Sequence, residues 1–248
     1  MNISLLIPCF NEELNIQKGV LDKIGNFTLD DDRFKEIIIV DDGSTDQSTT
    51  IIKELYLSKF KKFRLIEKKH KGKAFAIMTG IEKSISEFVM FTDIDLATPI
   101  EEAVKLISEA EKFPIIVGSR SSLRRGAPIL RQLMAVGFIF IRNLFLDLKG
   151  VRDTQCGFKI FRRDPALKIS ARLHVFKNGK QIKTSSVSAG FDLEFLFLAS
   201  KMGFAIKEVP VEWRHVETKN VNFIKDSLET LKDIARIKYY DLKGIYSK

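Results

Sequence analysis

Short apolar runs alternate with longer segments of helical spacing over the first half of the chain. The runs that read as buried strands lie at 2–8, 36–40, 63–67, 88–91 and 115–117. Helices are expected between them, ending near residues 24, 60, 84 and 112. Ile-rich runs of this kind are typical of strands buried on both faces of a sheet. The repeated β-α order predicts an α/β fold with a mainly parallel sheet and right-handed crossovers.

After residue 118 the pattern changes. We expect a loop and a long helix over 123–149, a strand at the end of 152–161, a loop or edge hairpin over 170–188, a helix over 189–202, and an edge strand over 205–213. Residues 222–240 carry apolar side chains near helical spacing, with Lys and Asp between them. This predicts an amphipathic helix that packs on the core or rests on a membrane surface.

Carboxylates follow two of the expected strands. Asp93 and Asp95 come directly after 88–91, and Asp42 follows 36–40. Alternate residues of an extended segment point the same way, so Asp93 and Asp95 can face one spot, where Mg²⁺ or Mn²⁺ would relieve their repulsion. The alternative is that Asp93 caps a turn and Asp95 caps the helix after Pro99.

Other polar residues at loop–helix junctions could either cap a helix or be solvated, or take part in binding or catalysis. Asn11 is a good N-cap for the first helix, and Ser44 or Thr45 can cap the second. The segment 68–74 is basic and contains one glycine, so it can cradle phosphate or simply be solvated. Asp192 is the best candidate for a general base if the substrate is a hydroxyl, and otherwise an N-cap of its own helix.

Size and charge narrow the possible partners. The chain has 248 residues, within the range of one α/β domain, and a formal net charge of +9, which favours anionic partners. No nucleic-acid motif accompanies the basic residues, so nucleic acid is not expected. The cysteines, Cys9 and Cys156, suggest reduced thiols in the cytosol. No signal peptide is apparent, and the apolar run 133–141 is shorter than the roughly 20 residues of a membrane span.

The motifs together resemble the family 2 glycosyltransferases, in particular those that load a sugar onto a polyprenyl phosphate. Within them the chain is most similar to dolichyl-phosphate β-glucosyltransferases, and next to dolichyl-phosphate mannose synthases. The resemblance rests on Ile7-Pro8-Cys9-Phe10-Asn11-Glu12, Val40-Asp41-Asp42-Gly43-Ser44-Thr45-Asp46, Lys71-Gly72-Lys73, Thr92-Asp93-Ile94-Asp95-Leu96-Ala97-Thr98-Pro99, Gly118-Ser119-Arg120 and Asp153-Thr154-Gln155-Cys156-Gly157-Phe158-Lys159, in that order.

The resemblance implies a nucleotide-sugar fold of the A type and roles for individual residues. The base and ribose pocket would be lined by Pro8, Phe10, Glu12, Val40 and Asp42. Asp93 and Asp95 would hold the diphosphate through Mg²⁺ or Mn²⁺, with Asp95 the direct ligand. The acceptor phosphate would be bound by Arg120 and Arg131, and the diphosphate contacted by Lys219. Residues 1–222 would form the transferase domain, with a nucleotide-sugar half over 1–117 and an acceptor half over 118–222, followed by a C-terminal helix and tail over 223–248.

Several positions depart from the family pattern. Phe10 stands where Tyr is usual, so a hydroxyl contact is lost while the ring face remains. Ala135 replaces a small hydroxyl residue of the mannose synthases, and Glu217-Thr218-Lys219 replaces Gly-Ser-Lys. The membrane helices of many relatives have no counterpart in this sequence. The chain is therefore expected in the cytoplasm, held peripherally on the cytoplasmic face of a membrane, with a membrane protein as a possible partner.

The function predicted from these features is inverting transfer of a hexose, with UDP-glucose as the favoured donor and a polyprenyl or dolichyl phosphate as the acceptor. A phosphate monoester, with a second pKa of about 6, is already anionic at neutral pH and can attack without a base. Alternatives are a mannosyltransferase using GDP-mannose, a family 2 transferase that uses Asp192 to activate a glycan or lipid hydroxyl, and a basic membrane-associated module without activity.

Overall fold

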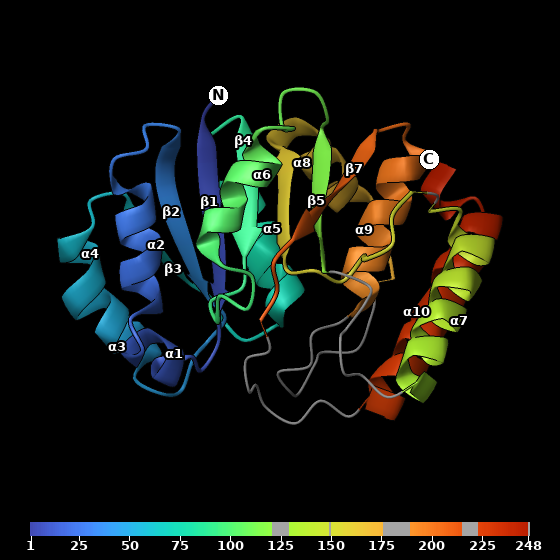
Figure 1. Cartoon of the computed structure of the whole chain (residues 1–248), viewed down its shortest axis with the longest axis horizontal. Coiled ribbons are helices and arrows are strands. Elements are labelled where there is room, and N and C mark those ends of the chain that lie inside the picture. Colours follow the sequence, from blue (N-terminus) through green and yellow to red (C-terminus); the bar gives the residue numbers. More distant parts are fainter. Residues whose placement is uncertain (121–128, 149, 176–188, 215–222, 248) are drawn as a thin grey trace.

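A seven-stranded sheet forms the centre of the computed structural model, with strand order β3-β2-β1-β4-β6-β5-β7. The structure describes residues 1–120, 129–148, 150–175, 189–214 and 223–247. The strands are β1 (Ile3–Cys9), β2 (Phe34–Asp41), β3 (Phe63–Glu67), β4 (Phe88–Thr92), β5 (Ile115–Arg120), β6 (Phe158–Arg162) and β7 (Ile206–Val211). Every strand except β6 runs in the same direction, which confirms the expected mainly parallel α/β sheet (Figure 1).

Helices cover both faces of this sheet. One face packs against α1 (Glu13–Gln17), α2 (Val20–Leu29), the continuous helical segment α3–η1–α4 (Ser48–Ile51, Ile52–Tyr56, Leu57–Lys59), and η2 with α6 (Ile100–Glu102, Ala103–Ile107). The other face packs against α5 (Lys73–Lys83), α8 (Arg163–Arg172) and α9 (Ala189–Lys201), with α7 (Ile129–Leu146), α10 (Phe223–Leu242) and η3 (Ile245–Ser247) outside them. The alternation of strand side chains divides the core: Leu6 belongs to the second face, and Leu5 and Ile7 to the first.

Three expectations about the elements were wrong in detail. The first helix does not run unbroken to residue 24. Gly19, with a φ of 76°, separates the short helix α1 from α2. The helix expected over 100–112 gives way to turns after Ile107. No helix was expected at Arg163–Arg172, where α8 forms; this helix is mostly polar and buries only Ala166 and Ile169.

The capping expectations were also wrong. Asn11 has a φ of 55° and does not cap α1; instead its Oδ1 accepts a hydrogen bond from the Thr45 amide at 2.7 Å. Gln47, with no side-chain cap bond, precedes α3 in place of Ser44 or Thr45. These residues tie the β1 loop to the β2 loop, because the Asn11 amide in turn donates to Ser44 Oγ at 2.9 Å.

The long helix α7 and the C-terminal helix α10 lie side by side at one end of the molecule (Figure 1). The amphipathic helix expected over 222–240 is confirmed as α10, which packs against α9 and α7. On α7 the described part exposes an apolar strip that includes Phe140 and Leu144, each 68 % exposed. None of the helices in the described ranges combines the length and apolar character needed to cross a membrane.

Candidate active site

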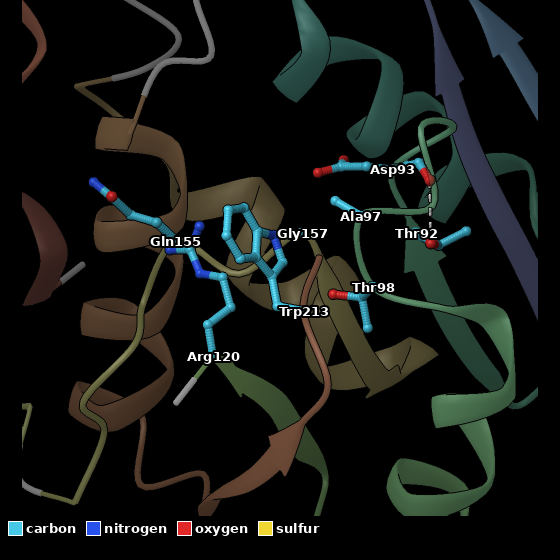
Figure 2. A pocket seen from close by; sticks show the side chains of 8 residues that line it. All are labelled: Thr92, Asp93, Ala97, Thr98, Arg120, Gln155, Gly157 and Trp213. Atoms are coloured by element: carbon cyan, nitrogen blue, oxygen red, sulfur yellow. Dashed lines mark hydrogen bonds between the residues drawn. The ribbon is translucent and has the colours of Figure 1, made fainter. Parts of the chain in front are cut away.

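The carboxyl ends of the parallel strands meet at one edge of the sheet, and β6 enters from that edge because it runs the other way. Phe158, the first residue of β6, pairs with Thr92, the last of β4. This pairing brings the loop before β6 beside Asp93. A cavity of about 50 Å³ lies there, lined by Thr92, Asp93, Ala97, Thr98, Arg120, Gln155, Gly157 and Trp213. Figure 2 shows Asp93 on one side of this cavity and Arg120 on the other, with Trp213 between them.

The two carboxylates after β4 are close enough to influence each other. Burial, and then the negative charge of Asp93, raise the pKa of Asp95 above its usual value. Asp95 Oδ1 accepts the Ala97 amide at 3.0 Å, so Asp95 closes a turn and does not cap the helix after Pro99. Asp93 forms an ion pair with Lys73, the first residue of α5.

Lys73 compensates the negative charge of this corner. Burial alone would lower its pKa, but Asp93, and after it Asp192 and Asp95, raise the pKa above its usual value. A cation held between Asp93 and Asp95 would supply the same compensation, and carboxylate oxygens suit Mg²⁺ or Mn²⁺. In the described ranges no group of three or more His, Cys, Asp or Glu side chains is arranged to hold a metal. The two carboxylates, Asp93 and Asp95, are nonetheless oxygen ligands of the type that such an ion prefers.

Gly157 allows Asp93 to occupy its position. A Cβ atom at residue 157 would lie 2.0 Å from Asp93 Oδ2 and 2.5 Å from its Cγ. The φ of Gly157 is not positive, so its backbone lies outside the left-handed region. The absence of a side chain is thus required by the close approach of Asp93 and not by backbone conformation.

Arg120, at the end of β5, is held by Asp153. Its Nε and Nη2 donate to the two carboxylate oxygens at 2.7 and 2.8 Å, and its amide donates to Asp153 Oδ2 at 3.0 Å. Burial alone would raise the pKa of Asp153, but the hydrogen bonds and charge of Arg120 lower it below its usual value. The guanidinium carbon lies 6.0 Å from the ring centroid of Trp213. A planar guanidinium fixed in this way at a cavity wall is suited to binding a phosphate.

The loop that carries Asp153 is itself anchored from two sides. Arg142 of α7, 1 % exposed, donates to the carbonyl of Arg152 at 3.0 Å and to that of Val151. Glu208 of β7 accepts the amides of Arg152 and Asp153 at 3.0 and 2.8 Å. These bonds connect α7 to the position of Arg120.

Asp192 lies in the first turn of α9, which begins at Ala189, so its interpretation as an N-cap was wrong. Its Oδ1 accepts a hydrogen bond from Lys159 Nζ at 2.7 Å. Lys159, on β6, is 1 % exposed and also donates to the Cys156 carbonyl at 2.5 Å. The buried ammonium therefore ties Asp192 to the loop that contains Gly157.

The residues expected around the nucleotide base come together at the ends of β1 and β2. Pro8 pairs with Val40 in the sheet. Phe10 lies just after β1 and stacks on the imidazole of His70. The buried Asp42 carboxylate accepts the amides of Lys71 and Gly72 at 2.9 and 2.7 Å. Glu12 accepts a hydrogen bond from Asn15 Nδ2 at 2.6 Å.

Some expected residues cannot be placed. Lys219 lies outside the described residues, and the side chains of Arg131 and Ala135 on α7 are likewise outside them. The structure adds contributors that sequence reasoning did not single out as site residues, namely Lys73, His70, Asp153, Gly157, Lys159 and Trp213. Four of these fall within sequence blocks already used for the family resemblance, whereas His70 and Trp213 carried no comparable signal.

Comparison with known proteins gives one consistent result. The family model described as "Glycosyl transferase family 2" matches residues 4–170. Dolichyl-phosphate β-glucosyltransferase of Dictyostelium discoideum is 32 % identical over 98 % of this chain and 76 % of its own length. The enzyme of that name from Homo sapiens is 31 % identical over 98 % and 77 %. Glucosyl-3-phosphoglycerate synthase from Mycobacterium tuberculosis, solved with Mn²⁺, UDP and glucosyl-3-phosphoglycerate, shares the fold with a TM-score of 0.65 at 19 % identity, covering 95 % of this chain and 79 % of that one.

Proposed function

Since the chain belongs to glycosyl transferase family 2 and is a glycosyltransferase, we propose that it transfers glucose from UDP-glucose to a polyprenyl phosphate of the dolichyl type, with inversion at the sugar. The names of the two relatives given above support glucose as the sugar and dolichyl phosphate as the acceptor, and a neighbouring structure solved with UDP-glucose supports the donor. The observation that carries the proposal is the cavity with Asp93 on one wall and Arg120 on the other. The carboxylate is suited to a metal-bound diphosphate and the guanidinium to a second phosphate.

Asp93 and Asp95 would hold Mg²⁺ or Mn²⁺, which when bound would neutralise charge on the departing nucleoside diphosphate. The neighbouring structures crystallised with Mn²⁺ or Mg²⁺ and UDP support the use of a divalent metal in general. Lys73 would remain beside the diphosphate, since it lies among the carboxylates of this corner. Phe10 and Asp42 would hold the base, with Pro8, Glu12 and Val40 around it, and Lys219 would contact the diphosphate.

The acceptor phosphate would be oriented by Arg120, together with Arg131. An anionic phosphate oxygen needs orientation and not deprotonation before it attacks the anomeric carbon. Asp153 keeps the guanidinium of Arg120 in one plane through two hydrogen bonds. Direct attack opposite the leaving group would give a β-linked product from an α-linked donor.

A hydroxyl acceptor is the second candidate, with Asp192 as the base. Asp192 is the carboxylate that pairs with the buried Lys159 ammonium, so protonating Asp192 would remove the negative charge of that ion pair. This contact favours the phosphate acceptor. Asp192→Asn would separate the two cases: transfer to a hydroxyl would be abolished, whereas transfer to a phosphate would be reduced without being lost.

A lipid acceptor requires the enzyme to reach a bilayer, and α7 offers a surface for this. Its exposed apolar residues Phe140, Ile141, Leu144 and Phe145 form a strip on a chain of net charge +9. We infer peripheral attachment through this strip on the cytoplasmic face. Phe140→Ser with Leu144→Ser should reduce co-sedimentation with vesicles containing anionic lipid. Unchanged co-sedimentation would refute this surface, and transfer to a short, soluble prenyl phosphate should be retained.

The function is tested by supplying labelled UDP-glucose and GDP-mannose in parallel with polyprenyl phosphate, detergent and Mg²⁺ or Mn²⁺. We expect label in the organic phase from UDP-glucose only, lost on chelation and in Asp95→Ala. Asp32→Ala, which removes an exposed carboxylate, is the matched control and should retain activity. Label from GDP-mannose only would replace the donor assignment, and no label from either donor would refute the lipid-phosphate acceptor.

A further inference from the structure

His70 occupies a position between two residues that the proposed function assigns to the nucleotide base. Its ring lies 4.1 Å from that of Phe10, centroid to centroid, at an interplanar angle of 18°. Its Nδ1 is 2.8 Å from Asp42 Oδ2 and 3.1 Å from the Asp42 carbonyl oxygen. Because both neighbours are acceptors, Nδ1 must carry the proton and donate.

This arrangement imitates a bound base. A pyrimidine base offers a flat ring for stacking and a ring N–H for a carboxylate, and His70 uses the same ring face and the same carboxylate. Resting on the proposed function, we propose that His70 is an internal ligand of the base site in the nucleotide-free protein, and that a uridine nucleotide must displace it from Phe10 and Asp42 to bind.

The resting position of His70 is incompletely satisfied. Its Nε2 is buried and has no hydrogen-bond partner among the described residues. A buried polar nitrogen without a partner is unfavourable, and movement of the ring toward water would relieve it. The imidazole therefore occupies the base site in the nucleotide-free protein but can be displaced by a nucleotide.

The surroundings allow the ring to leave while the loop stays in place. The amides of Lys68, Lys71 and Gly72 remain bonded to Asp41 and Asp42, so the backbone is anchored on both sides of His70. A cavity of about 300 Å³, lined in part by Asp42 and Lys71, lies beside the loop. Rotation of the His70 side chain is thus enough to expose the ring of Phe10. The Asp42 carboxylate stays in place for an incoming base, because the amides of Lys71 and Gly72 still hold it.

The inference is tested first by NMR of the histidine side chains, because the chain contains three histidines. Without ligand, the His70 ring signals, assigned with His70→Ala, should show the upfield shift of a ring stacked on Phe10. Addition of UDP with Mg²⁺ should abolish that shift and leave His174 unchanged. A His70 signal that keeps its shift at UDP saturation would overturn the inference while leaving the donor assignment intact. No response to UDP anywhere in the spectrum would overturn both.

Binding of UDP measured by calorimetry gives the second test. Removing a competitor raises apparent affinity, so His70→Ala should lower the Kd for UDP by about tenfold. His70→Phe, which keeps a ring for stacking, should bind no more tightly than the wild type. Lys69→Ala, an exposed neighbour in the same loop, controls for charge and should not tighten binding. Weaker binding by His70→Ala would show that His70 holds the nucleotide, contrary to the proposal.

Discussion

The substitution Gly157→Ala would displace the Asp93 carboxylate. We expect it to lower the rate of transfer much more than the stability of the fold. The added methyl group would lie 2.0 Å from Asp93 Oδ2 and 2.8 Å from Oδ1, whereas real contacts of this kind are essentially never under 3.0 Å. The carboxylate must therefore move by about 1 Å, and a displacement of that size at a reacting centre can cost about 100-fold in rate.

The effect on stability should be small by comparison. The group in the way is the end of a side chain and not backbone, and alanine tolerates the backbone conformation of Gly157. Asp93 and Lys73 are partly exposed, so disturbing their ion pair should cost at most about 1 kcal/mol. For a chain of this size that corresponds to a fall in Tm of about 2–4 °C.

The assay is transfer from UDP-glucose as a function of Mg²⁺ or Mn²⁺ concentration, with Tm measured on the same preparations. We expect a loss of about 100-fold in kcat/KM and a higher metal requirement. Gly137→Ala is the control, because its Cβ would meet nothing within 4 Å, and it should retain activity. Near-normal activity in Gly157→Ala would refute the argument that Asp93 must lie where the structure places it. Unfolding of the variant would refute the claim that only a side chain stands in the way.

Three further substitutions test the charges of the site. Burial and the Asp93 charge raise the pKa of Asp95 in the folded protein, so its ionisation opposes folding as pH rises through that pKa. Asp95→Asn should therefore raise Tm at neutral pH by an amount that disappears below the usual carboxyl range, while transfer is lost. The pKa of Asp153 is lowered, with Arg120 outweighing burial, so its pairing stabilises the fold above the usual range and is lost as pH falls. Asp153→Asn should lower Tm at neutral pH, with the difference shrinking in acid. Lys159→Met should lower the free energy of unfolding, measured by chemical denaturation, by about 3–5 kcal/mol, because it removes the ion-pair partner of Asp192. The double variant Lys159→Met with Asp192→Asn should recover part of that free energy.

The first five strands could be predicted from the sequence because each contains a short, mostly apolar run, whereas β7 could be predicted from the alternation expected of an edge strand. The run at 63–67 coincides with β3 at both ends, and that at 88–91 with β4 apart from Thr92. The position of β6 between β4 and β5 could not be predicted in this way, since Phe158 pairs with Thr92, which lies 66 residues earlier in the chain. Helix α8 was missed because two buried residues give little periodic signal.

Candidate site residues could be predicted where a short continuous stretch of sequence contains them. Their surroundings could not be predicted where they depend on a residue far away in the sequence. Asp93 and Asp95 follow directly from the strand before them. The environment of Asp192 depends on Lys159, which lies 33 residues earlier on a different element. Asn11 is a favourable cap by residue type, yet a bond to Thr45, 34 residues away, places it differently. Local propensity was overridden there by a contact between two loops.

The structure also explains how a site with so many charges can exist before any ligand binds. Three of the candidate groups are paired with an opposite charge from another element: Asp93 with Lys73, Arg120 with Asp153, and Asp192 with Lys159. The three ion pairs differ in how far their side chains are exposed to solvent. Lys159 is fully buried and fixes Asp192, and Asp153 fixes the plane of Arg120. The pair at Asp93 is the most exposed of the three, with Asp93 35 % and Lys73 24 % exposed. Under the proposed function, the Asp93–Lys73 pair would be the one that an incoming metal-bound diphosphate opens with least desolvation of the remaining partner, because Lys73 could then turn from a carboxylate to a phosphate.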